Sequence, residues 1–244
     1  TPRLSGFGNF AAVLSDPAFW RAVWFSLRFG VLTATVEVAL GLFLAVFLSP
    51  LLRARPWLLA LLTLPIMIAP AMMGLMYRLV LHEFVGPLPY YLIEWFGHSP
   101  AFLSPGLVFW TVCVIEILQW TPFALLLFHL AYSSIPADVR EAARMDGARA
   151  WRTFRRVELP MLMPTLALAA AIRLIDGIRV FDNIYVLVGA GPGGSTTSLP
   201  IYIYTAFFRG GSLGPALAAS VLFALAAFAG LFFALRAADR RAKA

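Results

Sequence analysis

The sequence predicts an all-α membrane protein, a polytopic helical bundle, on the strength of composition, long apolar runs and the placement of charge. Of its 244 residues, 61% are hydrophobic and only 13% are charged. Soluble domains carry about 25% charged residues and about 45–50% apolar ones. The basic residues are nearly all arginines, and they gather in short segments between the apolar runs. Lipid must therefore solvate much of this chain.

Five segments are long and apolar enough to cross a bilayer, which takes roughly 20 residues of helix. They lie at residues 22–49, 57–81, 105–132, 161–181 and 214–236. Pro65, Pro70 and Pro122 fall inside spans, where neighbouring helices can satisfy the freed backbone groups, so we expect kinks. The expected organisation is an exterior N-terminal segment (1–21), a transmembrane domain (22–236), a loop within it (133–160) and a C-terminal tail (237–244).

The arginines also predict the orientation of the spans. Residues 50–56, loop 133–160 and the tail carry most of the positive charge, whereas 82–104 has none and 182–213 has only Arg209. The positive-inside rule therefore places 50–56, the loop and the C-terminus in the cytoplasm. An exterior N-terminus with five spans and no signal peptide leads us to expect a further span upstream of Thr1, six in all.

Loop 133–160 reads as two amphipathic helices. Ser134 and Pro136 favour a helix start and Gly147 favours its end, with a second helix from about Ala148 to Glu158 before Pro160 opens the next span. One interpretation lays both helices on the inner leaflet. Against it, the first helix presents small alanines between acidic side chains, which disfavour an anionic leaflet. Docking on a partner protein fits that helix better.

The spacing of the loop carries a specific resemblance. Glu141-Ala-Ala143, Gly147 and Val157-Glu-Leu-Pro160 resemble the signature loop of ABC-importer permeases, with Val in place of the usual Ile. Downstream, the stretch from Arg179 to Leu187, Gly189–Pro192, Thr196-Thr197 and Tyr202–Tyr204 is similar to the sugar-importer branch. Val188-Gly-Ala-Gly-Pro192 stands where that branch usually has Thr-x-Gly-Gly-Pro, a small departure.

The resemblance implies a fold of the ABC type I importer permease kind, in the bacterial cytoplasmic membrane, working by alternating access. It implies as partners two ATPase subunits, a second permease subunit that is usually a different chain, a solute-binding protein, membrane lipid and a sugar-like substrate. In such permeases the first loop helix is the coupling helix, which seats in a cleft of the ATPase. The residues that carry this role over are Glu141, Ala142, Ala143, Asp146, Gly147, Leu159 and Pro160.

The residues themselves offer no catalytic apparatus. A P-loop needs Gly-x-x-x-x-Gly-Lys-Ser/Thr, yet the single lysine, Lys243, has no glycine-rich context. The histidines lack metal-ligand spacing, and no nucleophile–base pattern appears. Arginines confined to short loops do not form a nucleic-acid groove. We expect no cofactor, metal or nucleic acid on this chain, and ATP and Mg to be used by the partner ATPase.

Two groups of polar residues within the apolar spans are candidates for a substrate path. Arg173, Asp176, Arg179 and Asp182 alternate in sign at a spacing of three, which suggests either a structural ion ladder or a path in which Asp176, Asp182 and Asn183 bind sugar hydroxyls. Glu116, Gln119 and Trp120 share one helical face. They suit a sugar's hydroxyls and its apolar face, although a buried polar patch is the alternative.

The substrate class that these residues favour is a sugar, oligosaccharide or polyol. A phosphorylated polyol such as glycerol phosphate is the alternative, with Arg173 or Arg179 meeting the anion. A secondary transporter would need no ATPase, and the 141–160 loop argues against it. A membrane enzyme is disfavoured by the missing catalytic pattern.

Overall fold

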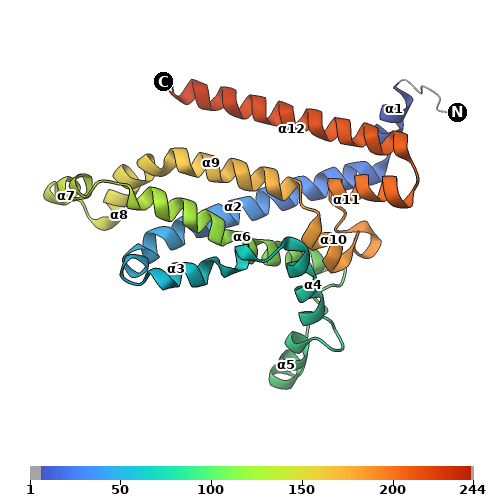
Figure 1. Cartoon of the computed structure of the whole chain (residues 1–244), viewed down its shortest axis with the longest axis horizontal. Coiled ribbons are helices and arrows are strands. Elements are labelled where there is room, and N and C mark those ends of the chain that lie inside the picture. The colour runs from blue at the N-terminus through green and yellow to red at the C-terminus, as the bar shows by residue number, and fades with distance from the viewer. Residues whose placement is uncertain (1–6, 243–244) are drawn as a thin grey trace.

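A computed structural model describes residues 7–242, except for the side chains of Arg144 and of residues 229–242. Every regular element within this part of the chain is a helix, which confirms the predicted all-α class. Three long helices form the centre: α2 (Pro17–Ala54), α6 (Val108–Ser133) and α9 (Leu159–Ile178). They lie side by side along the long axis of the molecule (Figure 1). Residues 1–6 of the expected N-terminal segment and 243–244 of the tail lie outside the described part.

The predicted spans are confirmed as apolar helices, but not all are straight. α2, α6 and the run Ala150–Val188 are long and apolar enough to cross a membrane. The predicted span 57–81 is instead broken into α3 (Pro56–Thr63), the 3₁₀ turn η1 (Leu64–Met67) and α4 (Pro70–Val80), with an 87° bend. Pro65 and Pro70 lack the N–H that a continuous helix needs there. The last predicted span lies in α12 (Leu213–Ala242), whose described apolar part is Leu213–Phe228.

Loop 133–160 differs from the expectation in its second half. After α7 (Ala137–Met145), α8 (Ala150–Thr153) runs through the π-helical turn η2 (Phe154–Glu158) directly into α9. The predicted separate helix with a break before Pro160 is therefore wrong. A wider π-helical turn directly before this proline accommodates its missing N–H and bulky ring, so the helix continues.

The end of the bundle opposite α7 is built from short helices (Figure 1). They are α1 (Gly8–Leu14), α10 (Asp182–Val188), the 3₁₀ turn η3 (Pro192–Gly194), α11 (Leu199–Tyr204) and the π-helical turn η4 (Thr205–Arg209). A further short helix, α5 (Pro87–Phe96), projects from the side of the bundle below α4 (Figure 1). α10 packs against α4, and α1 and α11 pack against the start of α12. The long helices therefore separate two differently built ends.

Small residues let the central helices approach closely. A Cβ added at Gly41 of α2 would lie 2.5 Å from the Cβ of Ala124 on α6, and one at Gly177 of α9 would lie 2.8 Å from the Cα of Gly30. Such contacts between small residues are typical of membrane helices, where packing drives association. They fix α2 against both of its neighbours.

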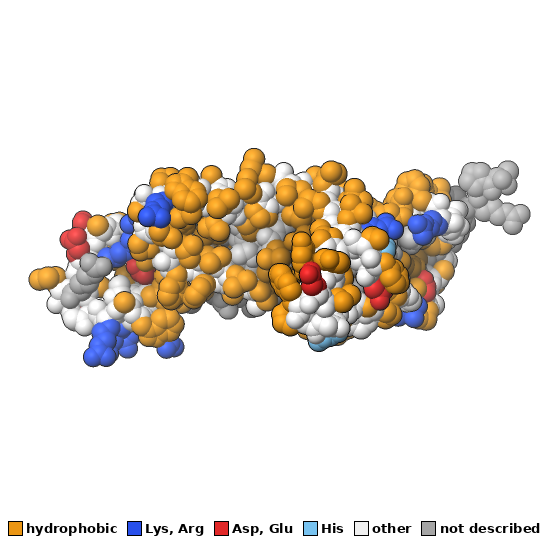
Figure 2. Space-filling model, turned by 90° about the horizontal axis from the view of Figure 1, so that it is seen from below, with side chains coloured by type: hydrophobic (Ala, Val, Ile, Leu, Met, Phe, Trp, Pro, Cys, Tyr) orange, Lys and Arg blue, Asp and Glu red, His pale blue; other side chains and the backbone are white. Residues whose placement is uncertain are grey.

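The outer faces of the long helices remain apolar. Phe43 and Phe47 on α2 are 52% and 68% exposed, and Val114 and Leu118 on α6 are also exposed. Hydrophobic side chains cover much of the face seen in Figure 2, and basic side chains lie toward its two ends. Exposed apolar surface on this scale is what a lipid environment accommodates.

Candidate functional site

The first part of the site is α7, whose ends follow the sequence signals. Pro136 stands one residue before Ala137, where the helix begins. Gly147 adopts a φ of 73°, and the N–H of Ala148 donates to the carbonyl of Ala143 at 3.0 Å. This is the hydrogen bond of a Schellman ending, which needs a left-handed residue and therefore favours glycine. The predicted role of Gly147 as a helix stop is confirmed.

α7 presents most of the residues assigned to ATPase coupling on its open side. Glu141, Ala142 and Asp146 are exposed, while Ala143 is buried against the bundle. Met145 at the tip is 88% exposed, and Trp151 on α8 is 70% exposed. The remaining coupling residues, Leu159 and Pro160, lie at the root of α9, half-buried and exposed, respectively. The open side of α7 thus carries an alanine among acidic side chains, with the large apolar side chains Met145 at its tip and Trp151 on α8 also exposed.

A polar anchor that the sequence reasoning missed ties α7 to the bundle. Arg140 Nε donates to Glu158 Oε1 at 2.7 Å, and Arg140 Nη2 donates to the carbonyl of Tyr132 at 2.9 Å. The Tyr132 hydroxyl also donates to Glu158 Oε1, at 3.1 Å. Charge-assisted hydrogen bonds of this length are among the stronger ones in proteins. These bonds tie α7 to the end of α6 and to the π-helical turn before α9.

The second part of the site is a buried charge cluster centred on Arg173 of α9. Its side chain is only 1% exposed. Its Nε lies 2.6 Å from Glu37 Oε2 on α2, its Nη2 lies 3.4 Å from Glu116 Oε1 on α6, and its Nη1 lies 3.3 Å from Asp176 Oδ2. One guanidinium thus joins all three central helices. A buried charge needs such partners, because no water reaches it.

Further polar side chains extend the cluster. Asn183 Nδ2 of α10 donates to Glu116 Oε2 at 2.5 Å. Gln119 Nε2, one turn along α6, donates to the carbonyl of Ile68 at 2.9 Å, in the break of the bent span. The Arg173 guanidinium lies 4.4 Å from the centroid of the Trp120 ring, a cation–π contact. The cluster therefore links α10 and the bent span to the central helices.

Most of the predicted path residues meet here. Glu116, Trp120, Asp176 and Asn183 surround Arg173, and Gln119 adjoins them. Asp176 keeps 43% of its side chain exposed and Trp120 is half-buried, whereas Glu116, Gln119 and Asn183 are buried. Asp182 lies apart, exposed at the start of α10. The open rim of the cluster is thus formed by a carboxylate and an indole.

The predicted four-residue ion ladder is wrong beyond its first pair. Arg173 and Asp176 pair at the expected spacing, but α9 ends at Ile178 and α10 begins only at Asp182. Arg179 and Asp182 are exposed, and neither has an ion-pair partner within 4.0 Å among the described side chains. Residues three apart in sequence are neighbours only within a helix, so the ladder cannot continue past the end of α9.

Glu37 also belongs to the charge cluster, and its partner could not be predicted from the sequence. It stands out as a carboxylate inside a long apolar span, but its pairing with a residue 136 positions away leaves no local signal. Its Oε1 atom has no hydrogen-bond partner within the described part of the chain. The cluster as described thus gathers three carboxylates around one guanidinium.

Comparison with known proteins agrees with this arrangement. The family described as the binding-protein-dependent transport system inner membrane component matches residues 37–243. The trehalose/maltose transport system permease protein MalF of Thermococcus litoralis is 33% identical over 219 residues, covering 89% of this chain and 74% of that protein. A probable ABC transporter permease of Sinorhizobium fredii is 34% identical over 234 residues, covering 94% of this chain and 75% of that protein.

A sulfoquinovosyl glycerol transport system permease of Agrobacterium fabrum is 32% identical over 229 residues, covering 90% of this chain and 72% of that protein. Among solved structures, a bacterial ABC transporter involved in the import of the acidic polysaccharide alginate superposes with a TM-score of 0.88 at 23% identity. The match covers 98% of this chain and 85% of that one. The structural likeness extends over the helices that hold both parts of the site.

Proposed function

Because this chain belongs to the family of binding-protein-dependent transport system inner membrane components, an ABC-importer permease family, we propose that it forms one permease half of an ATP-driven importer for a sugar or oligosaccharide. Its relatives include permeases named for trehalose and maltose and for sulfoquinovosyl glycerol. The substrate proposal rests on these relatives, together with the carboxylate and indole at the rim of the charge cluster.

The observation that carries the energy-coupling part of the proposal is the open surface of α7. Ala142 is exposed there between acidic side chains, the helix ends before the left-handed Gly147, and Met145 and Trp151 are also exposed. Small side chains permit a partner backbone to approach closely, and exposed apolar groups of this size favour a protein contact. In this proposal α7 seats on a separate ATPase subunit, which binds the ATP and Mg, so this chain is itself not an enzyme.

The two ends of the bundle then face opposite compartments. α7 and the arginine-rich segments lie at one end, and α10 and α11 at the other (Figure 1). The proposal places α7 and the C-terminus in the cytoplasm and the α10–α11 end outside, toward the solute-binding protein. A second permease subunit would pair with this one, and the substrate would pass between them.

In this proposal Trp120 and Asp176 line the substrate path. The buried side chains behind them are Glu116, Gln119 and Asn183. Asp182 lies nearer the exterior end. The phosphorylated-polyol alternative is less favoured, because the guanidinium of Arg173 is enclosed by three carboxylates. Arg179, its other candidate, lies exposed beyond the end of α9 and outside this cluster. An alternating movement of the bundle would have to carry this cluster with it.

Uptake by the complete importer, reconstituted in vesicles with its binding protein and ATPase, tests the function. The proposal predicts ATP-dependent uptake of a neutral probe, maltose or trehalose, without competition by glycerol phosphate. Uptake of these probes without ATP would indicate a secondary transporter. Competition by glycerol phosphate alone would favour the phosphorylated-polyol alternative.

Single variants test the path. Asp176→Asn and Trp120→Leu should lower uptake strongly at unchanged assembly with the ATPase, because they alter the rim that contacts substrate. Arg179→Gln serves as the control, since its side chain is exposed beyond the end of α9. Normal uptake by both rim variants would contradict the assignment.

A further inference from the structure

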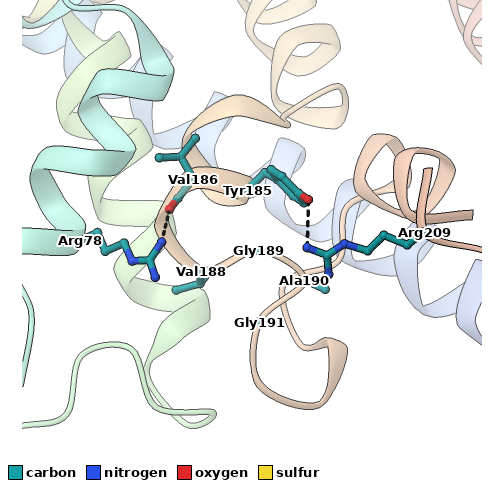
Figure 3. Close-up of a pocket in the computed structure, with 8 residues that line it drawn as sticks. All are labelled: Arg78, Tyr185, Val186, Val188, Gly189, Ala190, Gly191 and Arg209. Carbon is teal, nitrogen blue, oxygen red and sulfur yellow. Dashed lines mark hydrogen bonds between the residues drawn. The ribbon is translucent and has the colours of Figure 1, made fainter. Parts of the chain in front are cut away.

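Two arginines flank an open hollow of about 640 Å³ at the end of the molecule opposite α7. Arg78 comes from α4 and Arg209 from η4, and they stand on either side of the segment from Tyr185 to Gly191 (Figure 3). Nothing in the transport cycle proposed above uses this hollow. Its lining brings two positive charges from distant parts of the sequence to one place.

Both guanidinium groups keep most of their hydrogen-bonding capacity. Arg78 Nη1 donates to the carbonyl of Val186 at 3.4 Å, and Arg209 Nη2 donates to the hydroxyl of Tyr185 at 3.2 Å. Each guanidinium carries five N–H donors. No carboxylate lies within 4.0 Å of either group in the part of the chain that the structure describes. The two arginines are thus held in position by neutral oxygens while their charge stays uncompensated.

The floor of the hollow leaves room for a ligand. Gly189 and Gly191 both have positive φ, 64° and 75°, and no heavy atom lies within 4 Å of the position that a Cβ at Gly189 would take. The backbone therefore leaves open space at Gly189, whereas a side chain at Gly191 would meet Thr196. A ligand with two acceptor oxygens, such as a carboxylate, matches guanidinium donors in geometry and in charge.

The position of the hollow indicates which partner could supply the carboxylate. It lies at the α10–α11 end, which the proposed function turns toward the solute-binding protein. We propose that the Arg78–Arg209 hollow seats an acidic side chain on the docking face of the solute-binding protein. This inference rests on the proposed function, because it needs that protein as a partner.

Binding of the purified solute-binding protein to the complete importer, held in nanodiscs of neutral phosphatidylcholine, tests the proposal. Arg78→Gln and Arg209→Gln should each weaken binding about two- to fivefold, the range for partly exposed pairs. The double variant should weaken it further and flatten the dependence of affinity on salt. Arg21→Gln is the matched control, because Arg21 is exposed near the same end but does not line the hollow.

Basal ATP hydrolysis of each variant importer should stay at the wild-type rate, which shows that the complex is intact. A charge swap would identify the contact. Changing the acidic residue of the binding protein to Arg should restore affinity for an importer that carries Arg209→Glu.

Unchanged affinity and unchanged salt dependence in the double variant would overturn the proposal. So would an effect of the arginines that appears only with anionic phosphatidylglycerol, because the hollow would then hold a lipid headgroup. Since binding is measured without transport, a failure to carry maltose would count against the substrate and not against the docking site.

Discussion

Arg173 Nε on α9 lies 2.6 Å from Glu37 Oε2 on α2, and both side chains are buried although 136 residues separate them in sequence. This pair, extended by Glu116, is a polar link among the three central helices. In an apolar interior neither charge can find water when the other is removed. The register of α2 and α9 therefore depends on the pair.

Replacing Arg173 with Met should destabilise the protein, because it leaves Glu37 and Glu116 buried without their cation. Breaking a buried pair on one side costs roughly 3–5 kcal/mol. Thermal unfolding of the detergent-purified complex should show a clearly lower midpoint, and less protein should reach the membrane. Arg179→Met, in an exposed position, should change neither.

The double variant Arg173→Met with Glu37→Met separates the pair from general disruption. Removing both charges should restore part of the lost stability, since one desolvated carboxylate disappears. Strictly additive losses would show that the two residues do not act together.

Replacing Arg140 with Ala should uncouple ATP hydrolysis from transport. The variant loses the bonds to Glu158 Oε1 and to the carbonyl of Tyr132, which hold α7 on the bundle. We expect uptake to fall severalfold while the complex continues to hydrolyse ATP. Arg155→Ala, on an exposed position of η2, is the control. Parallel loss of hydrolysis and uptake in Arg140→Ala would argue that the anchor supports assembly instead.

The contact between Tyr202 and Asp16 should give a pH dependence at alkaline pH. The Tyr202 hydroxyl donates to Asp16 Oδ2 at 2.7 Å, and burial, together with this bond, raises the pKa of Tyr202 from 10.0 to about 12. The stabilisation is therefore complete below pH 10 and is lost as the pH rises from about 10 to about 12. Tyr202→Phe should be less stable by roughly 1 kcal/mol below pH 10. The difference from wild type should shrink as the pH rises above 10; a constant difference in unfolding midpoint would refute this assignment.

Replacing Gly147 with Val should abolish coupling without affecting insertion. The residue has a φ of 73°, and a β-branched side chain in that conformation costs about 1–2 kcal/mol or more. No heavy atom lies within 4 Å of the added Cβ position, so the effect comes from backbone strain at the end of α7 and not from a clash. Membrane levels should be normal and uptake lost. Gly97→Val, at a φ of 76° directly after α5, controls for the effect of backbone strain alone.

The sequence predicted the features that depend on local chemistry. Apolar runs located the helices, and Gly147 marked the end of α7 through its own conformational freedom. It did not predict features set by distant contacts. Pro65 and Pro70 signalled irregularity, but the 87° bend depends on tertiary packing, including the Gln119 bond to Ile68. Pro160 led to the opposite error. It suggested a boundary between two helices, but the π-helical turn η2 accommodates the proline and the helix continues into α9.

The charged residues show the same division. Their presence within apolar spans predicted a buried polar site, and five of the predicted path residues do adjoin one another. Spacing alone suggested that Arg173 belongs to a ladder along one helix. Its partners Glu37 and Glu116 come from α2 and α6, a pairing that only the packed helices reveal.

The claim that α7 docks on the ATPase is tested most directly by photo-cross-linking from Met145, which is 88% exposed at the tip of the helix. A benzophenone maleimide attached to Met145→Cys, in a Cys113→Ala background, should label the ATPase subunit in the assembled importer. The same probe at Trp95→Cys, exposed on α5, which projects from the side of the bundle beyond α4, should not. Labelling of the ATPase from position 95, or its absence from position 145, would contradict the account.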